Sequence, residues 1–318
     1  MSEEDLLAGL LGRAQQPQPV DVSPGEPRSL DERRPEPSPP AEPALRSGLL
    51  IATGLGTAAA WVLGSATAID ALLSRGRTGA LGSAALIDLV ANGVVFGGLL
   101  AIAVVMVRLQ PIARLQQNLS PLKAVPLGFL IGTGGLSLGL LHAWLERGVF
   151  APPGSQSHGA GLFLAGSLVT LFGAFVEEKF FRGWLQKRVI LLRGNAFGIV
   201  LSALAFALLH VFGDDRTALS LVNIGLAGVL FGLLALRTGA IWASVAAHFG
   251  WNWSELLLFG LVPNPGASSF GSVFDLELVG SPIWGGSAQG LNGSIAVTAV
   301  LVALILPFLG RSPRAQRA

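Results

Sequence analysis

The sequence predicts an all-α fold, a polytopic transmembrane helical bundle of about eight spans with both termini cytoplasmic. The composition is 51% hydrophobic and only 13% charged, whereas soluble domains carry roughly 25% charged residues. The apolar residues form runs that approach the ~20 residues a membrane-spanning helix needs. Basic residues gather in alternate gaps between these runs. Because the bilayer offers the backbone no hydrogen-bond partners, we expect the runs to be helices.

The first 46 residues differ from the rest of the chain. They hold nine acidic residues, five arginines and many prolines. Such a stretch buries too little apolar surface to fold, so residues 1–46 are predicted to be a disordered, Pro-rich cytoplasmic tail. The stretch lacks a basic start followed by an apolar segment, so it is not a signal peptide.

The apolar runs divide the remaining chain into three parts. We predict N-terminal transmembrane helices over 47–158, a helical core over 159–261, and an outer loop with the last transmembrane helix over 262–318. The loop, 262–290, is rich in Gly, Ser and Pro, and no chemistry is assigned to it. The predicted spans are roughly 48–69, 81–107, 125–145, 159–178, 196–212, 217–236, 239–261 and 291–309.

The distribution of basic residues predicts the orientation. With eight spans and the N-terminus inside, the inner segments after the tail carry twelve Lys and Arg residues and the outer loops carry four. Cytoplasmic loops are enriched in Lys and Arg, so both termini are expected in the cytoplasm. The chain is therefore predicted to be a multi-pass integral protein of the bacterial cytoplasmic membrane. Its first expected partner is therefore the lipid bilayer, and nucleic acid is not expected.

The absence of two residue types limits the catalytic side chains and metal ligands that the chain can use. The chain has no Cys and no Tyr, which excludes disulfides, thiolate metal sites and a cysteine nucleophile. Ionisable residues at membrane depth are then the main functional candidates, because burying them is costly. Asp88 and Asn92 form one i, i+4 pair, for which a helix–helix contact is sufficient explanation.

The strongest candidates begin with Glu177 and Glu178. Glu178 and Arg182 are i, i+4 neighbours in the favourable order for an ion pair. Glu177 projects about 100° away from Glu178 and remains available. A plain salt-bridge cluster at the membrane edge would explain these three residues alone.

His210 is predicted to lie at the depth of Glu177. The stretch Arg193-Gly194-Asn195 signals a turn between two helices. Glu177 and His210 lie about equally far from that turn, which is the register a carboxylate–imidazole pair needs. A lone buried histidine is otherwise more often a structural hydrogen-bonding group.

His248 and Asn252 lie four residues apart on one face of the next-but-one predicted helix. They fall within a turn or two of the same layer, although an interhelical polar contact would also explain them. Glu255 is predicted on the same helix face as Asn252, where it would be either a further participant in the site or a structural partner. Each of these observations is weak alone. Because Glu177, His210, His248 and Asn252 are all expected at a similar depth in neighbouring helices, together they favour a catalytic site.

These residues resemble the motifs of the CPBP family, the CAAX prenyl protease and bacteriocin-processing membrane proteins also called the Abi family. The family pattern combines Glu-Glu-x-x-x-Arg, Phe-x-x-x-His and His-x-x-x-Asn. Here the motifs read Glu177-Glu178-Lys-Phe-Phe-Arg182, Phe206-Ala-Leu-Leu-His210 and His248-Phe-Gly-Trp-Asn252. The match covers about residues 160–260.

The resemblance implies an intramembrane endopeptidase whose catalytic core is the helical region 159–261. Its further partner would then be a peptide or membrane-protein substrate. Glu177 would be the general base and His210 would orient the attacking water. His248 and Asn252 would stabilise the oxyanion, and Glu178 with Arg182 would fix the helix and the local charge. No cofactor is favoured. The alternative is zinc held by Glu177, His210 and His248.

Other classes of protein remain as alternatives. A transporter, or an immunity or scaffold protein, would use the same buried polar residues without hydrolysis. No His-Glu-x-x-His motif is present, which argues against a zincin-type protease. Gly135-Leu-Ser137-Leu-Gly139 matches a nucleophile-elbow pattern, but it lies in an apolar predicted helix where small residues serve packing. A substrate that is prenylated and CAAX-type is an expectation from the family alone.

Overall fold

The structure, a computed structural model, describes residues 44–74, 83–111, 117–152, 159–212, 217–261, 269–286 and 289–309. These residues fall within one compact unit, Pro43–Ala318. All but the last three residues of the predicted N-terminal tail lie outside the described residues, as do parts of the predicted outer loop.

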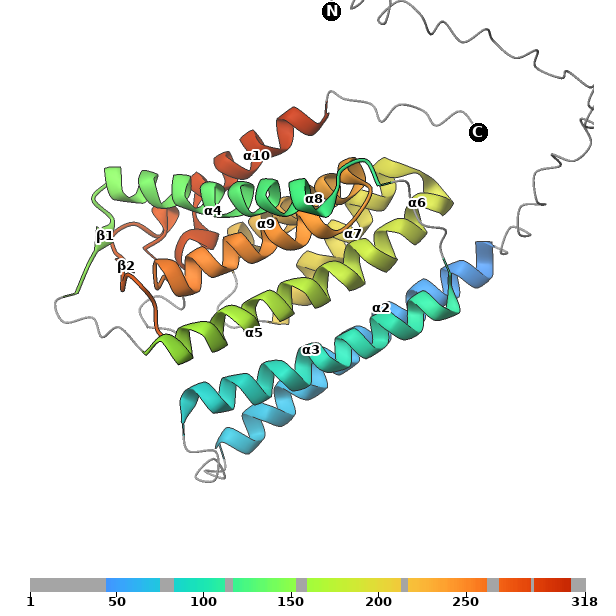
Figure 1. The fold of residues 1–318 in the computed structure, drawn as a ribbon, viewed down its shortest axis with the longest axis horizontal. Coiled ribbons are helices and arrows are strands. Elements are labelled where there is room, and N and C mark those ends of the chain that lie inside the picture. Colours follow the sequence, from blue (N-terminus) through green and yellow to red (C-terminus); the bar gives the residue numbers. More distant parts are fainter. Residues whose placement is uncertain are drawn as a thin grey trace, which may run out of the picture. The chain divides into compact units, whose positions relative to one another are not determined.

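The predicted all-α fold is confirmed, because helices make up nearly all of the described chain (Figure 1). Two two-residue strands, β1 (Val149–Phe150) and β2 (Glu277–Leu278), form one short antiparallel pair. The helices are α2 (Ala44–Ser74), α3 (Ala84–Leu109), α4 (Pro121–Leu145), α5 (Ala160–Glu178), α6 (Lys187–Arg193), α7 (Asn195–Leu209), α8 (Ala218–Thr238), α9 (Trp242–Trp253) and α10 (Ile295–Leu309). Shorter π and 3-10 segments are η3 (Lys179–Gln186), η4 (His210–Phe212), η5 (Ser254–Leu258), η6 (Pro282–Trp284) and η7 (Gly290–Gly293).

Each of the eight predicted apolar runs contains a helix in the structure. Among the described residues, five helices are long and apolar enough to cross a membrane. Helices α7 and α10 are apolar but have 15 residues each, a length of about 22 Å. The membrane bundle is thus confirmed, while the number of spans and the side of the termini stay predictions.

The fourth predicted span is longer than expected. It was expected to end at residue 178, but α5, η3 and α6 form one helix from Ala160 to Arg193. No proline occurs in this stretch before Gly194, whose positive φ of 85° ends the helix. Glycine adopts this backbone conformation without the penalty that a Cβ would impose. The predicted turn between the two core helices is therefore confirmed at Gly194.

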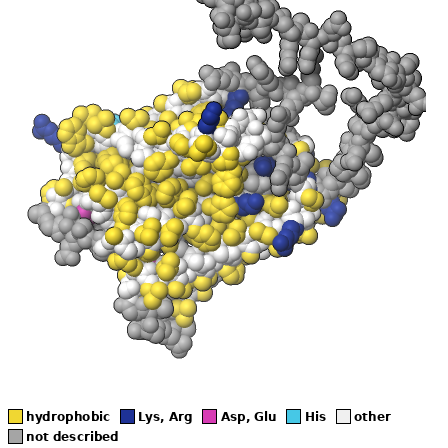
Figure 2. Space-filling model, viewed as in Figure 1, with side chains coloured by type: hydrophobic (Ala, Val, Ile, Leu, Met, Phe, Trp, Pro, Cys, Tyr) yellow, Lys and Arg dark blue, Asp and Glu magenta, His cyan; other side chains and the backbone are white. Residues whose placement is uncertain are grey.

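The surface suits a lipid environment. Large apolar side chains lie exposed on several helices, including Leu130 at 69%, Leu208 at 63% and Leu306 at 59%. Figure 2 shows hydrophobic side chains over much of one face, with most Lys and Arg towards the right, where α6 lies in Figure 1. Exposed apolar area on this scale is typical of a membrane interaction surface.

Helices α4 and α9 form the most extensive helix pair of the described chain. A Cβ added at Gly128 would lie 2.1 Å from the carbonyl oxygen of Ala243, and one at Gly132 would lie 2.0 Å from that of Ala247. The two backbones are therefore in direct contact, as small residues allow in membrane helices. We call this contact the glycine seam; it fixes the helix that carries His248 and Asn252.

Two further glycines of α4 have the packing role that the sequence suggested. Gly135 and Gly139 of the elbow-like pattern face Trp251 and Val297 from within α4. That pattern is thus helical, and no strand precedes it among the described residues.

The glycine seam predicts a position-dependent effect of valine substitutions in α4. Gly132→Val should separate α4 from α9 and lower stability, because overpacking a fitted interface typically costs ~1–3 kcal/mol. Gly134→Val is the matched control, since nothing lies within 4 Å of a Cβ at Gly134. Thermal unfolding in detergent should show a midpoint several degrees lower for Gly132→Val only. Equal midpoints for the two variants would refute a tight seam.

Candidate active site

A fully buried ion pair forms the base of the site. Glu178 at the end of α5 contacts Arg182 in η3, with 2.7 Å between Oε1 and Nη1 and neither side chain exposed. Arg182 also donates from Nη2 to the carbonyl oxygen of Gly228 at 2.9 Å. The guanidinium carbon lies 4.7 Å from the ring centre of Phe206 and 5.5 Å from that of Phe231. Aromatic faces attract cations most strongly where water is excluded, so the predicted pair is present and well supported.

His248 of α9 lies between the two adjacent glutamates. Its Nδ1 is 3.1 Å from Oε1 of Glu178, and its Nε2 is 3.5 Å from Oε2 of Glu177. The ring stacks on Phe231 with 5.0 Å between centres and 17° between planes. Because a carboxylate only accepts hydrogen bonds, the contact with Glu178 requires a proton on Nδ1. Glu178 therefore fixes the orientation of His248 and keeps a proton on its Nδ1.

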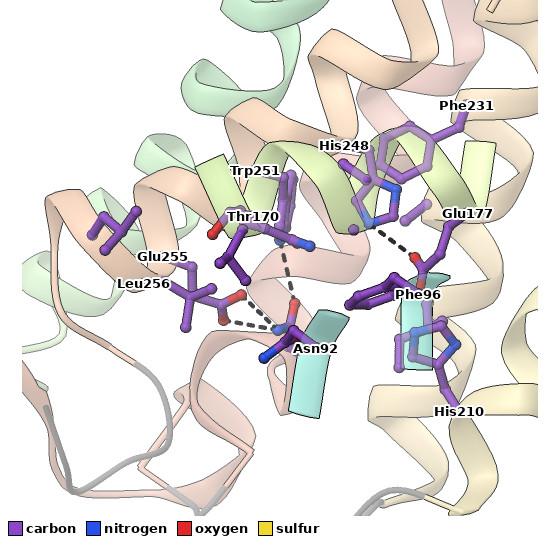
Figure 3. Close-up of a pocket in the computed structure, with 18 of the residues that line it drawn as sticks. Asn92, Phe96, Thr170, Glu177, His210, Phe231, His248, Trp251, Glu255 and Leu256 are labelled. Carbon is purple, nitrogen blue, oxygen red and sulfur yellow. Dashed lines mark hydrogen bonds and ion pairs between the residues drawn. The ribbon is translucent and has the colours of Figure 1, made fainter. Parts of the chain in front are cut away.

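His210 approaches the site from the end of α7. Its Nδ1 lies 2.8 Å from the carbonyl oxygen of Phe206, an acceptor, so this nitrogen carries the proton and Nε2 is a basic nitrogen in the neutral ring. His210 and Glu177 line the same cavity. In the view of Figure 3, the Glu177 carboxylate lies between the rings of His248 and His210. The depth register predicted from the turn at Gly194 agrees with this arrangement.

The cavity has a volume of about 710 Å³ and is walled by α3, α5, α7, α8 and α9. Four of the six predicted residues line it: Glu177, His210, His248 and Asn252. The other two, Glu178 and Arg182, lie fully buried beneath it. The wall also contains apolar side chains and several amides, the usual composition of a small-molecule or peptide site.

Two π-helical segments adjoin the site. Residues Lys179–Gln186 are π-helical directly after Glu178, and Ser254–Leu258 are π-helical two residues after Asn252. A π-turn accommodates one more residue than an α-turn, so it changes the direction in which the side chains around it point; such segments are frequent at functional sites. The sequence contained no signal for either segment.

The structure adds polar residues that the sequence analysis did not assign to the site. Asn292 of η7 donates from Nδ2 to both carboxylate oxygens of Glu255, at 2.7 and 3.0 Å. Ser269 of the predicted outer loop donates to the carboxylate of Asp88. All four residues line the cavity. Glu255 was identified only by its helix face, while Asn292 and Ser269 lie in Gly- and Ser-rich stretches that show no periodicity.

The alternative zinc set was Glu177, His210 and His248. Among the described residues, no group of three or more His, Asp or Glu side chains has the spacing of a metal site. The residues present therefore do not fit a three-residue zinc site in this conformation.

Comparison with known proteins supports the same family as the motifs. Residues 159–254 match the family model of the type II CAAX prenyl endopeptidase Rce1-like proteins. No curated protein matches the chain significantly. The matched segment spans α5 to the start of η5 and contains all six motif residues. The match thus supports the resemblance that the motifs carry: residues 159–254 are similar to the Rce1-like type II CAAX prenyl endopeptidases.

Proposed function

We propose that this protein is an intramembrane endopeptidase that hydrolyses a peptide bond with a water molecule activated by Glu177. The main support is the different environment of two neighbouring carboxylates. Glu178 is fully buried against Arg182, whereas Glu177 lines a cavity shared with His210, His248 and Asn252. Glu178 thus has a structural role, whereas Glu177 is available to a substrate.

The first step is attack by water on the carbonyl carbon of the substrate. Glu177 accepts one proton of the water as the new C–O bond forms, and Nε2 of His210 accepts a hydrogen bond from the same water. This arrangement uses Glu177 as general base and His210 as the group that orients the water. The carbonyl oxygen becomes an oxyanion in the tetrahedral intermediate.

His248 and Asn252 stabilise that oxyanion in this scheme. His248 donates from Nδ1 to Glu178, so donation from Nε2 as well requires an imidazolium. Glu177, Glu178 and Arg182 together carry one net negative charge, which such a cation balances. When the intermediate collapses, the C–N bond breaks and the proton held by Glu177 passes to the leaving amine. Glu178 and Arg182 are positioning residues that act through His248.

The substrate in this proposal is a membrane-associated peptide or protein segment, cleaved near the cytoplasmic half of the bacterial cytoplasmic membrane. The family match supports a prenylated, CAAX-type C-terminus as the first substrate to test. A quenched fluorescent prenyl-peptide incubated with the detergent-solubilised protein is a direct assay.

Substitution of the two glutamates should separate chemistry from folding. Glu177→Gln should lower kcat at least ~100-fold, because a general base contributes about 10²–10⁴-fold, and should leave the unfolding midpoint nearly unchanged. Glu178→Gln should also remove activity, and in addition destabilise the fold by ~3–5 kcal/mol, because Arg182 then stays buried without its partner. Both quantities are measured on the same preparations.

The control for this experiment is a metal chelator. Cleavage by the wild-type protein should survive chelation. Full activity in Glu177→Gln would contradict the proposed base. Loss of wild-type activity on chelation alone would replace it with a metal mechanism, and absence of cleavage would favour a transporter or scaffold.

The oxyanion role predicts a specific kinetic signature for Asn252. Asn252→Ala and the isosteric Asn252→Asp should each lower kcat by about 10²–10³-fold with little change in KM, because the amide donor acts mainly in the transition state. Steady-state kinetics with the same peptide measure both constants. A variant that raises KM and keeps kcat would assign Asn252 to ground-state binding instead.

A further inference from the structure

A second cavity lies on the side of α5 and α9 that faces away from the catalytic groups. Its volume is about 540 Å³, and the ten residues of α4, α5 and α9 that line it are all aliphatic or aromatic. In the view of Figure 1, α9 lies between α4 and α5. None of the described lining residues is shared with the active-site cavity that contains Glu177. The proposed hydrolysis therefore does not use this second cavity.

Helix α5 separates the two cavities. Gly173 and Glu177 line the active-site cavity, whereas Leu171 and Phe175 line the second cavity. Residues two apart on an α-helix project about 200° from each other, so the cavities lie on opposite sides of α5. Because α5 also packs against α9, the two helices form a wall between the second cavity and the catalytic groups.

The second cavity opens on the surface that suits lipid. Three of its lining residues are well exposed, namely Leu168 at 59%, Leu171 at 40% and Trp242 at 41%. Two others, Val245 and Ala246, are only 6% exposed and lie deeper. In a bilayer, the neighbours of such an opening are lipid tails, which are as apolar as leucine. An acyl chain can therefore enter the cavity from the side.

A lysine lies at one end of this cavity. Lys179 follows Phe175 by one helical turn, and its backbone N–H donates to the carbonyl oxygen of Phe175. A Cβ placed at Gly183 would lie 3.3 Å from Cδ of Lys179 and 4.0 Å from Cγ2 of Ile241. The stem of Lys179 thus runs close to Ile241, the residue directly before Trp242. Lys179 is therefore located at the end of the cavity where α9 begins.

Lys187 adds a second positive charge near the same end. Both lysines are half-buried, and their charges are close enough to repel each other. Within the described chain, neither Lys179 nor Lys187 forms an ion pair with an acidic residue. Two neighbouring cations without an acidic partner create a positive potential that attracts an anion.

The length of the helix places the lysines at the level of lipid headgroups. The helix from Ala160 to Arg193 has 34 residues, about 51 Å, whereas the hydrocarbon core is ~30 Å thick and is crossed by about 20 residues. Counted from Ala160, the core therefore ends near Lys179. Tryptophan is enriched at this interface, and Trp242 lies beside the lysine. An apolar cavity thus meets a cationic end at the membrane surface.

From these observations we propose that the second cavity binds one anionic glycerophospholipid. Its acyl chain lies among α4, α5 and α9, and its phosphate lies between Lys179 and Lys187. The two lysines select a lipid with a net negative charge over a zwitterionic lipid. Basic pockets between helices on the cytoplasmic side, where the predicted orientation places this end, are known to bind acidic headgroups. The lipid is a bound partner behind the catalytic helices and not a substrate, so the inference does not depend on the proposed hydrolysis.

The headgroup is tested by native mass spectrometry of the delipidated full-length protein in detergent. Titrations with dioleoyl phosphatidylglycerol, an anion, and dioleoyl phosphatidylcholine, a zwitterion, give Kd for the first bound lipid. The wild type should bind the anionic lipid at least ~10-fold more tightly, as expected for two lysines near one phosphate. Lys179→Gln combined with Lys187→Gln should reduce this ratio to about one. The matched control Lys123→Gln, at an exposed lysine of α4 that does not line the cavity, should keep the ratio.

The acyl chain is tested by filling the cavity. Leu171→Trp should weaken binding of both lipids at least ~10-fold, as expected when about two CH₂ groups lose their burial. The matched control is Leu164→Trp, at an exposed α5 position that does not line the cavity. It should leave both Kd values unchanged.

Several outcomes would overturn the inference. Equal Kd values of the wild type for the two lipids would contradict the role of the lysines, and so would an equal loss of preference in Lys123→Gln. Displacement of the lipid by glycerol phosphate, which has no acyl chain, would reduce the site to a surface anion site. Displacement by the prenyl-peptide of the activity assay would assign the cavity to the substrate. None of these measurements requires turnover, so they are decisive whether or not the wild type cleaves the peptide.

Discussion

The contact between Glu178, Arg182 and His248 lies at the centre of the structure. Both members of the ion pair are fully buried, and the oxygen that binds Arg182 also accepts from His248. Buried charges are tolerated only when they are paired and hydrogen-bonded. The three residues come from α5, η3 and α9, and Arg182 extends the set to α8 through the carbonyl of Gly228. Four elements are thereby held at one point, and the cavity forms directly beside it.

This arrangement gives neighbouring residues different tasks. Along the α5–η3 helix, Glu178 faces the protein interior and Glu177 faces the cavity. The change to π-helical geometry directly after Glu178 alters which residues share a face. Along α9, His248 reaches the ion pair, while Asn252 and Glu255 face the cavity further along. A rigid polar interior and a polar cavity can thus coexist in a bundle whose outer surface is apolar.

Much of this architecture was predictable because the bilayer limits the alternatives. Long apolar runs had to be helices, and Gly194 was a clear turn signal, so the depth of Glu177 and His210 followed from counting residues. The contact of His248 with both glutamates was not predictable, because it depends on how α9 packs against α5. The hydrophobic pattern does not indicate the π-helical segments, because their geometry is set by tertiary packing. Asn292 was missed because it lies in a glycine-rich turn that shows neither periodicity nor a motif.

The glycine seam between α4 and α9 has a mechanical consequence. Gly128 and Gly132 bring one backbone directly against the other, so the two helices are closely packed and we expect them to move as one rigid piece. His248, Asn252 and Glu255 belong to that piece, whereas Glu177 and His210 belong to α5 and α7. A motion that widens the active-site cavity therefore displaces α3, α5, α7 or α8 relative to the α4–α9 pair. A displacement of α5 or α7 would separate Glu177 and His210 from His248 and Asn252, so under the proposed mechanism the site would be incomplete while open and would assemble only on closing.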